Sequence, residues 1–554
     1  MRLIRSSINI IRAEGIGRFW RLLRGWLRGE RGAYKPQLPP VTYDDFRCRT
    51  DPTPTSLTAP WQTTFAIVLY NSDGLDDQPT RQSLQAQIYP HWSMMEAGAA
   101  LTADYVVLVN TGDTLAINAL FKTAEAVHNF EQPALLYADC DRLNAAGERV
   151  DPFFKPDFSP EMMLSVNLLG DLLVVRRDLW VGEMESRWDH AFRLIESVPK
   201  GQRIHHIPHV LYHRRTAPEN GQQAVAAHLL RTGIREAIIT EDSYDLLRAR
   251  WQLEPTRRVS IIIPSRDQPE LVERCLSTLF EQTDYPDFQV ILVDTGSVDP
   301  ATYVLYEWFD RDPRFSLVHY EGVFNFSRAC NLGAEVADGD LLLFLNNDTE
   351  ILHADWLHRM AQWFARPGVG MVGAKLLYPD GRIQHAGVIL GLHGLAAHIF
   401  ALMSEHSQTI YGSESWYRNY VAVTGACMMV SRAVFDQVGG FEEAYQLNYS
   451  DVELCIRAVE AGYRVVYTPD ARLKHHESAT HQKQIPIADT ALFNQRLQGY
   501  LRRGDPYFNS NLSYRAAVPA FQRDADDTPA NNNAIMIAKL DERINAERGT
   551  HDLA

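Results

Sequence analysis

The chain has 554 residues, too many for one hydrophobic core, so two or three domains are expected. Its content of 45% hydrophobic and 22% charged residues is ordinary for a globular protein, and the net charge of −15 argues against nucleic acid as a partner. The six cysteines form no CxxC pair, no apolar run reaches the roughly 18 residues of a membrane span, and no cleavable signal pattern opens the chain. Together these features predict a cytoplasmic protein.

The first 32 residues are basic although the whole chain has a negative net charge: they contain eight arginines and only two acidic residues. Apolar residues, Trp20 and Leu23 among them, recur mostly at spacings of three and four, which predicts an amphipathic helix. Such a helix can lie in the headgroup region of an anionic membrane, so residues 1–32 are interpreted as a membrane-surface helix on the inner face. The alternative is a helix packed on its own protein with its arginines in water. A proline-rich linker is expected over 33–62.

A first α/β segment is predicted over residues 63–250. Apolar runs at 65–70 and 104–110 predict buried strands, and the second run ends in a polar turn that contains Asp113. A second segment, over 256–483, repeats this order more completely. The two segments are therefore interpreted as an internal duplication.

Strands in the second segment are predicted at 258–264, 288–294, 315–319 and 340–348, with helices at 270–282, 303–309 and 327–336 between them. Strands that alternate with helices indicate a mostly parallel sheet, and ligands of such sheets bind beyond the carboxyl ends of the strands. From first strand to acidic turn the second copy takes 88 residues, Ile261 to Asp348, whereas the first takes 47, Ile67 to Asp113. The first copy lacks the region of the strand that ends at Asp294 and the next strand–helix unit, and is interpreted as degenerate. A helical extension and polar tail are expected over 484–554.

Two polar groups stand at predicted strand ends. A carboxylate at Asp294 can accept hydrogen bonds from a base or ribose, although an aspartate there can also simply form a turn. The Asn346-Asn347-Asp348 turn offers hard oxygen ligands of the kind that a divalent cation on a sugar diphosphate requires, or it is an Asx turn.

Two further groups lie beyond residue 440. Asp451 and Glu453 open a predicted helix at an i, i+2 spacing that places them on different faces, so they need not share a role, and Asp451 can also act as a helix cap. The adjacent His475 and His476 are expected on a loop, where a neutral imidazole nitrogen can bind a metal, although one such pair alone is often incidental.

In this order the motifs resemble the family 2 glycosyltransferases of the GT-A fold, especially the rhamnosyltransferase-like enzymes of surface-polysaccharide (O-antigen type) assembly. The resemblance covers residues 259–481. It rests on Val-Ser-Ile-Ile-Ile-Pro264, Leu-Val-Asp294-Thr-Gly-Ser, Leu-Phe-Leu-Asn-Asn-Asp348, Arg382-Ile-Gln-His-Ala-Gly387, Thr424-Gly-Ala-Cys427, Ser450-Asp-Val-Glu-Leu-Cys-Ile-Arg457 and His475-His-Glu-Ser478. It implies an α/β fold with two tandem GT-A-like domains of mostly parallel sheet, the first one truncated.

The resemblance also implies roles by position. Asp451 would be the general base of an inverting transfer. Asp348 and His475, with His476 as the alternative, would bind a divalent metal, Mg or Mn. The nucleotide sugar would contact Pro264, Ser265, Arg266, Asp294, Asn331, Asn346 and Asn347, and the acceptor side would comprise His385, Gly425, Ala426 and Glu453. The expected partners are a nucleotide-sugar donor, a glycan or lipid-linked glycan acceptor and an anionic membrane surface.

Two positions depart from the family pattern. Glu453 stands where relatives often have aspartate, and Ala479-Thr480-His481 replaces the usual Ser-Arg-Gly. Three other functions compete with the transferase interpretation. A glycosidase would need its carboxylate pair but no nucleotide pocket. A non-catalytic carbohydrate-binding scaffold would suit the first copy, and a bifunctional enzyme would need the segment that the first copy lacks.

Overall fold

The computed structural model describes residues 40–51, 60–70, 74–95, 100–182, 186–476 and 486–551. The predicted membrane-surface helix over 1–32 and the altered motif at 479–481 lie outside the described residues. Helix α3 (Tyr43–Thr50) belongs to a separate compact unit that ends at Asp51, and its amino terminus is capped by the Thr42 side chain. The elements described below belong to the second unit, and none of the described helices is long and apolar enough to cross a membrane.

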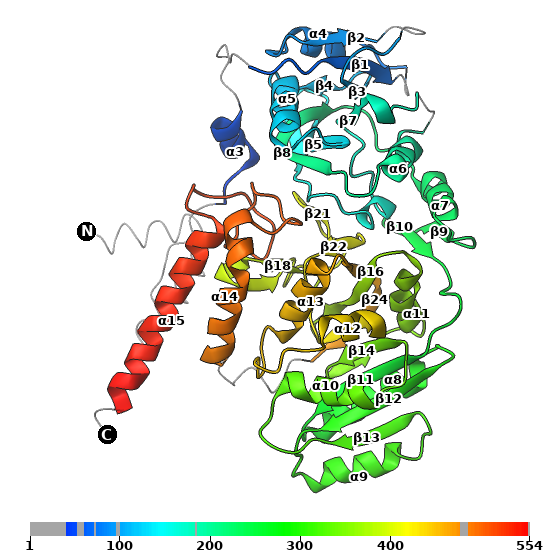
Figure 1. The fold of residues 1–554 in the computed structure, drawn as a ribbon, viewed down its shortest axis with the longest axis vertical. Coiled ribbons are helices and arrows are strands. Elements are labelled where there is room, and N and C mark those ends of the chain that lie inside the picture. The colour runs from blue at the N-terminus through cyan, green and yellow to red at the C-terminus, as the bar shows by residue number, and fades with distance from the viewer. Residues whose placement is uncertain are drawn as a thin grey trace. The chain divides into compact units, whose positions relative to one another are not determined.

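The first domain, blue through cyan to green in Figure 1, is built on an eight-stranded sheet with the order β2-β1-β3-β7-β5-β8-β4 and with β6 beside β5. Its strands are β1 (Phe65–Tyr70), β2 (Trp92–Met94), β3 (Tyr105–Asn110), β4 (Thr114–Leu115), β5 (Leu135–Leu143), β6 (Arg149–Phe153), β7 (Leu173–Arg176) and β8 (Ile204–Arg214). Its helices are α4 (Gln78–Gln85), α5 (Ala119–Asn129), α6 (Arg187–Ser197) and α7 (Gln222–Arg231), and the hairpin of β9 (Ile238–Glu241) and β10 (Leu247–Arg250) follows them.

The second domain has a ten-stranded sheet with the order β13-β12-β11-β14-β23-β16-β24-β15, in which β17 pairs with β16 and β22 with β24. Its strands are β11 (Val259–Ser265), β12 (Phe288–Asp294), β13 (Phe315–His319), β14 (Leu341–Leu345), β15 (Thr349–Ile351), β16 (Val369–Leu377), β17 (Ile383–His385), β22 (Arg418–Tyr420), β23 (Cys427–Ser431) and β24 (Arg464–His475). Small hairpins are formed by β18 (Val388–Leu390) with β19 (Ala396–His398) and by β20 (Gln408–Thr409) with β21 (Gly412–Ser413).

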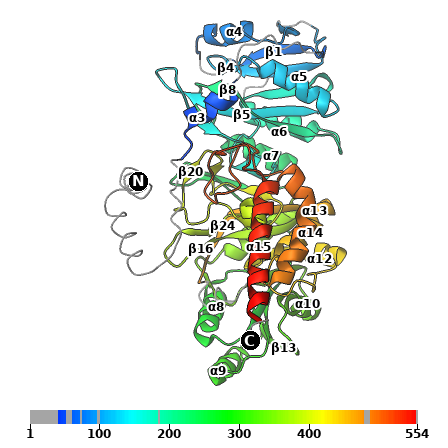
Figure 2. The same cartoon turned by 90° about the vertical axis from the view of Figure 1, so that its left-hand side faces the viewer.

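The helices of this domain are α8 (Pro269–Gln282), α9 (Pro300–Phe309), α10 (Phe326–Val336), α11 (Trp356–Ala361), α12 (Arg432–Val438) and α13 (Ser450–Glu460), and α14 (Ile487–Arg503) and α15 (Pro529–His551) follow. Helix α8 illustrates why they form: a proline at its first position fixes the backbone, and Val272, Cys275, Leu276 and Leu279 give it a buried apolar stripe. All five residues of β14 are buried because the strand lies inside the sheet. Figure 2 shows α15 beside α14, to which it is joined by a hydrogen bond from Asn533 Nδ2 to Asn494 Oδ1 (2.8 Å).

The two sheets share one topology. Strands β1, β3, β7, β5, β8 and β4 follow each other in the same order and with the same parallel or antiparallel sense as β11, β14, β23, β16, β24 and β15. This confirms the predicted tandem α/β folds, and each sheet combines parallel strands with antiparallel ones, since β7 and β23 run antiparallel to both neighbours. The strand equivalent to β12 is not lost, since β2 pairs with β1 over three residues, and the first sheet, as described, has no counterpart of β13.

A buried carboxylate joins the two domains. Glu161 of the first domain is fully buried between Arg366 and Arg464 of the second, at N–O distances of 3.2 and 2.9 Å. Asn419 Nδ2 donates to its second oxygen at 2.7 Å. Burial alone would raise the pKa of Glu161, but the two guanidinium groups outweigh it and lower this pKa to about 2.

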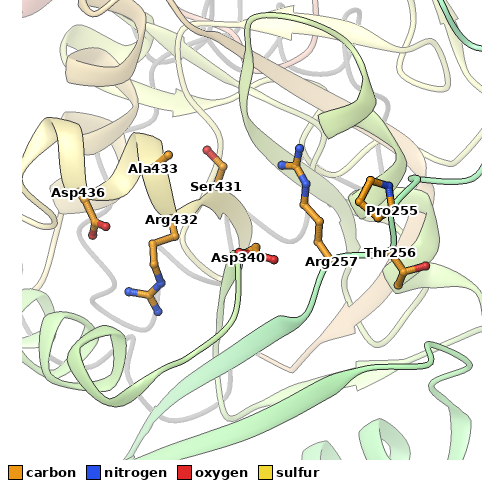
Figure 3. Close-up of a pocket in the computed structure, with 8 residues that line it drawn as sticks. All are labelled: Pro255, Thr256, Arg257, Asp340, Ser431, Arg432, Ala433 and Asp436. Atoms are coloured by element: carbon orange, nitrogen blue, oxygen red, sulfur yellow. The ribbon is translucent and has the colours of Figure 1, made fainter.

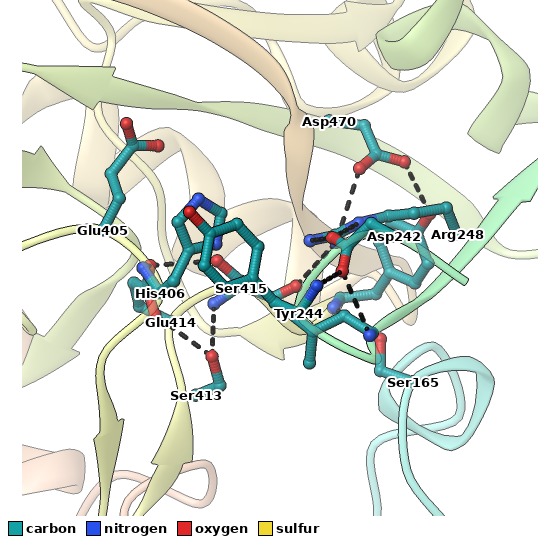
Figure 4. A network of polar contacts seen from close by, with 12 residues as sticks. Ser165, Asp242, Tyr244, Arg248, Glu405, His406, Ser413, Glu414, Ser415 and Asp470 are labelled. Carbon is teal, nitrogen blue, oxygen red and sulfur yellow. Dashed lines mark hydrogen bonds and ion pairs between the residues drawn. The ribbon is translucent and has the colours of Figure 1, made fainter. Parts of the chain in front are cut away.

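The β9–β10 hairpin is anchored to the second domain by the polar network in Figure 4. Arg248 forms ion pairs with Asp242 of its own hairpin at 2.8 Å and with Asp470 of β24 at 3.5 Å. It also donates to the backbone carbonyl of Ser415 at 2.8 Å. The Tyr244 ring stacks on His406 with a centroid distance of 3.7 Å. The loop between β9 and β10, through Tyr244, and strand β10, through Arg248, therefore both contact the second domain.

Candidate functional site

Polar groups gather where β11, β12 and β14 end. Ser265 and Asp294 are direct partners in the β11–β12 register, and Asn347 Nδ2 donates to the Ser265 hydroxyl at 3.1 Å. Pro264 is half-buried beside Ser265, and the Arg266 side chain is exposed. The carboxyl ends of adjacent parallel strands therefore present most of the predicted donor-side residues, Asn331 excepted, at one end of the sheet.

Asp294 is held firmly at this end of the sheet. It is 2% exposed, and its Oδ1 accepts the Ser297 backbone N–H at 3.1 Å and the Ser297 hydroxyl at 2.5 Å. Tyr306 donates its hydroxyl to the same oxygen at 3.4 Å, while Oδ2 lies 3.8 Å from His319 Nδ1. One carboxylate oxygen is thus fixed by the turn after β12, and the other faces the edge strand β13.

Asp348 lies next to His475. Its Oδ1 is 2.9 Å from His475 Nε2, and Asn346 Nδ2 is 3.1 Å from the same nitrogen. Burial would raise the pKa of Asp348, but the hydrogen bond and charge of His475 lower it below its usual value. His475 is not on a loop as expected, because β24 continues through the Thr468-Pro-Asp470 turn with a register shift and ends at His475, opposite Thr349 of β15.

Gln384 sets the orientation of the His475 ring. Its side-chain carbonyl Oε1 lies 2.6 Å from His475 Nδ1, and because a carbonyl can only accept, Nδ1 carries the hydrogen. With a hydrogen on Nδ1, Nε2 donates to Asp348 only when it carries a hydrogen too, whereas in the neutral ring its lone pair is available to a cation. His476 turns elsewhere: its Nε2 lies 2.9 Å from Glu350, and its ring contacts Arg274. The structure thus places His475, rather than the alternative His476, beside Asp348.

Asp451 is connected to the same end of the sheet through the backbone. Its Oδ2 accepts the N–H of Gly425 at 2.7 Å, and the neighbouring carbonyl of Ala426 accepts the N–H of Asn346 at 3.0 Å. A Cβ at position 425 would come within 3.1 Å of the Asp451 Cβ, so a glycine permits this close approach. Asp451 is half-buried and lies in the first turn of α13.

Two predicted site residues have other hydrogen-bond partners in the structure, and a third, His385, is buried with no hydrogen-bond partner at either ring nitrogen among the described residues. Glu453 is 6% exposed and makes two hydrogen bonds with Arg457, at 2.9 and 2.8 Å. The Asn331 amide binds the backbone N–H and carbonyl of Phe441, both at 2.9 Å, which fixes the loop after α12. His385 is fully buried, and burial, with smaller contributions from His398 and His475, lowers its pKa well below the usual value. These contacts are structural, and the roles predicted for the three residues remain predictions.

The first domain has an acid and a histidine at equivalent places. Asp113 precedes β4 as Asp348 precedes β15, and His213 pairs with Thr114 as His475 pairs with Thr349. Here, however, Asp113 is fully buried and accepts hydrogen bonds from Tyr212 Oη, Asn110 Nδ2, Thr216 Oγ1 and two backbone N–H groups. His213 Nδ1 turns to Asp141 Oδ1 at 2.7 Å. The acid and the histidine of the first domain therefore bond to other residues rather than to each other.

A pocket of about 500 Å³ lies at the opposite end of the strands of the second sheet, where the parallel strands begin (Figure 3). Arg257 precedes β11, Asp340 precedes β14, and Ser431 ends the antiparallel β23. Arg432 in its wall donates to the carbonyls of Gly339, Ala334 and Ala337 and is therefore used structurally. This pocket is separate from the strand-end residues described above. No group of three or more His, Cys, Asp or Glu side chains within the described ranges forms a ready metal site.

Comparisons with known proteins identify relatives of the second domain. Residues 260–439 match the family model described as glycosyl transferase family 2. The chain is 39% identical over 458 residues to the O-antigen biosynthesis protein RfbC of Myxococcus xanthus, which covers 78% of this chain and 36% of that protein. It is 25% identical to the O-antigen chain rhamnosyltransferase RfbN of Salmonella typhimurium, over 43% of this chain and 72% of that protein.

The overlap with full-length relatives is partial. The chain spans 36% of the Myxococcus protein and 48% of a Sinorhizobium fredii protein that is 34% identical to it. Among solved structures, a mannosyltransferase from Pyrobaculum calidifontis in complex with GDP-Man and Mn²⁺ has a TM-score of 0.33 at 16% identity, covering 51% of this chain and 78% of that one.

Proposed function

The chain carries a glycosyl transferase family 2 domain at residues 260–439, and from this premise we propose that it transfers a sugar from a nucleoside-diphosphate donor to a glycan hydroxyl with inversion at the anomeric carbon. One observation carries the proposal: the groups predicted for the donor, the metal and the base are linked at one end of the sheet. The links are Asn347 to Ser265, Asp348 to His475, Asn346 to Ala426 and Gly425 to Asp451.

The donor side consists of the ends of β11 and β12. We assign Asp294 to the nucleoside, because a buried carboxylate fixed at a strand end can accept hydrogen bonds from a base or ribose. Pro264, Ser265, Arg266 and Asn347 follow at the same end of the sheet, where the exposed Arg266 guanidinium offers charge to the diphosphate.

A divalent cation, Mg or Mn, fits beside Asp348. The Asp348 carboxylate oxygen and His475 Nε2 lie only 2.9 Å apart, close enough to bind one ion together, and a carboxylate and an imidazole are ligands that Mn²⁺ accepts. When bound, the cation would offset the negative charge of the departing diphosphate. Since the protein supplies Asp348 and His475, diphosphate oxygens and water would complete the shell.

Removing the Gln384 acceptor should weaken metal binding. Gln384→Met leaves the Nδ1–H of His475 without a partner and frees the ring to change tautomer, so the Mn²⁺ dissociation constant should rise about 10- to 100-fold. Gln384→Glu keeps an acceptor and should retain affinity near that of the wild type. Titration of Mn²⁺ followed by electron paramagnetic resonance measures both, without any need for turnover. Equal affinity of Gln384→Met and wild type would show that Gln384 does not orient a metal ligand.

Asp451 is proposed as the general base. Held by the Gly425 N–H and half-buried, it can accept the proton of an acceptor hydroxyl as the oxygen attacks the anomeric carbon from the face opposite the leaving group. A single displacement inverts that carbon and forms no covalent sugar–enzyme intermediate. The proton ends on the Asp451 carboxylate, and the bond to the diphosphate breaks.

We further propose that the first domain does not catalyse transfer. Its Asp113 already accepts five hydrogen bonds, and His213 turns its Nδ1 to Asp141, so the two side chains do not face each other as Asp348 and His475 do. Its role is then to support the second domain through Glu161 and to guide the acceptor. A lipid-linked glycan at the inner membrane face, approached through the arginine-rich residues 1–32, suits the O-antigen setting named for relatives.

Turnover of nucleotide sugars tests the proposal. The purified chain is incubated with dTDP-rhamnose and with nucleotide-linked galactose, glucose and mannose, in Mg or Mn, with and without EDTA and lipid-linked acceptor extracts. We expect one donor to release its nucleoside diphosphate, in a reaction that EDTA stops. Absence of turnover and of binding with every donor would instead favour a non-catalytic carbohydrate-binding protein, and turnover that EDTA leaves unchanged would exclude the metal.

A further inference from the structure

The loop that leads into Asp451 is held by the C-terminal segment. The backbone N–H groups of Gln446, Leu447 and Asn448 all donate to the Asp489 carboxylate, at 3.0, 2.8 and 2.8 Å. Asp489 lies in the first turn of α14 and is 1% exposed. Three consecutive N–H groups bound to one buried carboxylate fix the path of this loop, because each would lose its partner if the carboxylate were removed.

Helix α14 makes a second contact at the next residue. The Phe493 ring stacks on Tyr449 with a centroid distance of 4.5 Å and an interplanar angle of 1°. Tyr449 has a left-handed backbone (φ +67°), which is costly for a bulky residue and persists only when its surroundings impose it. Tyr449 immediately precedes α13, in which Asp451 is the second residue. The start of α13 is therefore held by α14.

We propose that Asp489 is a positioning residue for the transfer step, acting through the 446–449 loop on Asp451. Both α13 and α14 (Ile487–Arg503) follow residue 439, where the family match ends, so these contacts lie outside the matched region. Asp489 does not touch the donor site, since its hydrogen bonds are to the loop. The inference rests on the proposed role of Asp451 as the base, and predicts that the C-terminal segment completes the active site.

Kinetics of the full chain test this. Asp489→Asn, which keeps one acceptor oxygen, and Asp489→Ala should lower kcat by about 10-fold and 100-fold, because a displacement of about 1 Å at a catalytic group costs about 10²-fold. The KM for the nucleotide sugar should change less than about two-fold, since Ser265 and Asp294 are held by other contacts. Phe493→Leu, which removes the stacked ring and keeps the helix, should also lower kcat with the KM retained.

A matched control lies in the same segment. Asp527 is fully buried and accepts from Ser513 Oγ at 2.5 Å, Tyr514 N at 3.1 Å and Asn532 Nδ2 at 3.1 Å, but it does not contact the 446–449 loop. Asp527→Asn should lower the melting temperature and leave kcat unchanged. If Asp527→Asn lowers kcat as much as Asp489→Asn does, the effect is one of general stability and the inference fails.

The double variant separates this inference from the proposed function. Asp489→Ala should cost no further activity in an Asp451→Asn background, because two residues that act as one unit are not additive. If Asp451→Asn lowers transfer and Asp489→Ala does not, the positioning inference is wrong while the proposed function stands. If Asp451→Asn leaves transfer unchanged, the proposed base fails, and the inference fails with it.

Discussion

Replacing Asp451 by asparagine should reduce sugar transfer by about 10³-fold, within the range that general-base catalysis contributes. Asparagine keeps the shape of the side chain and still offers an oxygen to the Gly425 N–H, so the loop should be preserved. It cannot accept the proton of the acceptor hydroxyl. The loss should therefore appear in kcat, while equilibrium binding of the donor nucleotide stays within about two-fold of wild type.

Glu460→Gln provides a control on the same helix. Glu460 lies at the other end of α13, where it pairs with Arg496 and its side chain is 52% exposed. Its substitution should change neither kcat nor donor binding, because exposed ion pairs contribute about 1 kcal/mol or less. Transfer by Asp451→Asn at more than about a tenth of the wild-type rate would exclude Asp451 as the base.

Replacing Glu161 by alanine should destabilise the chain by about 3–5 kcal/mol. The substitution leaves Arg366 and Arg464 facing each other across a buried interface with no counter-charge, and breaking a buried pair in this way has costs of that size. Because the glutamate joins the two domains, calorimetry should show separate transitions for them. Glu196→Gln, in an ion-pair cluster with Arg231 inside the first domain, should change stability by about 1 kcal/mol or less.

The ion pairs of Glu161 should also make the free energy of unfolding sensitive to acid. The pKa of Glu161 is about 2 in the folded chain against the ordinary value of 4.5, so its contribution is complete above pH 4.5 and is lost as the pH falls toward 2. The difference corresponds to about 3 kcal/mol. The free energy of unfolding of the wild type should therefore fall more steeply between pH 4.5 and 3 than that of Glu161→Gln. Parallel pH profiles for the two proteins would show that this carboxylate is not held ionised by its arginines.

Local patterns in the sequence predicted the strands around the donor side well. Apolar runs placed the buried strands β11 and β14 close to their observed bounds, and β12 and the partly exposed edge strand β13 match their predicted bounds. The loop predicted for His475 was wrong, because β24 does not end at the Thr468-Pro-Asp470 turn. Its turn residues are absorbed by a register shift between Ala374 and Lys375 of β16, and the strand continues to His475.

Local sequence patterns could not predict the contacts that support the site residues. Gln384 is 91 residues from His475, and Asp489 is more than 40 residues from the backbone that it binds. Only the tertiary fold creates these pairs. Gln384 lies inside the Arg382-Ile-Gln-His-Ala-Gly387 motif, which could have identified it. The residue predicted from that motif was His385, which is buried. For Asp489 no signal was present.

The most direct test of the central claim is anomalous scattering from crystals of the chain grown with Mn²⁺ and the nucleoside diphosphate of its donor. We expect one manganese peak per chain beside Asp348 and His475, with the diphosphate at the ends of β11 and β12. A manganese peak at Asp113 and His213, or a nucleotide in the pocket of Arg257 and Arg432, would contradict the assignment of the active site to the second domain.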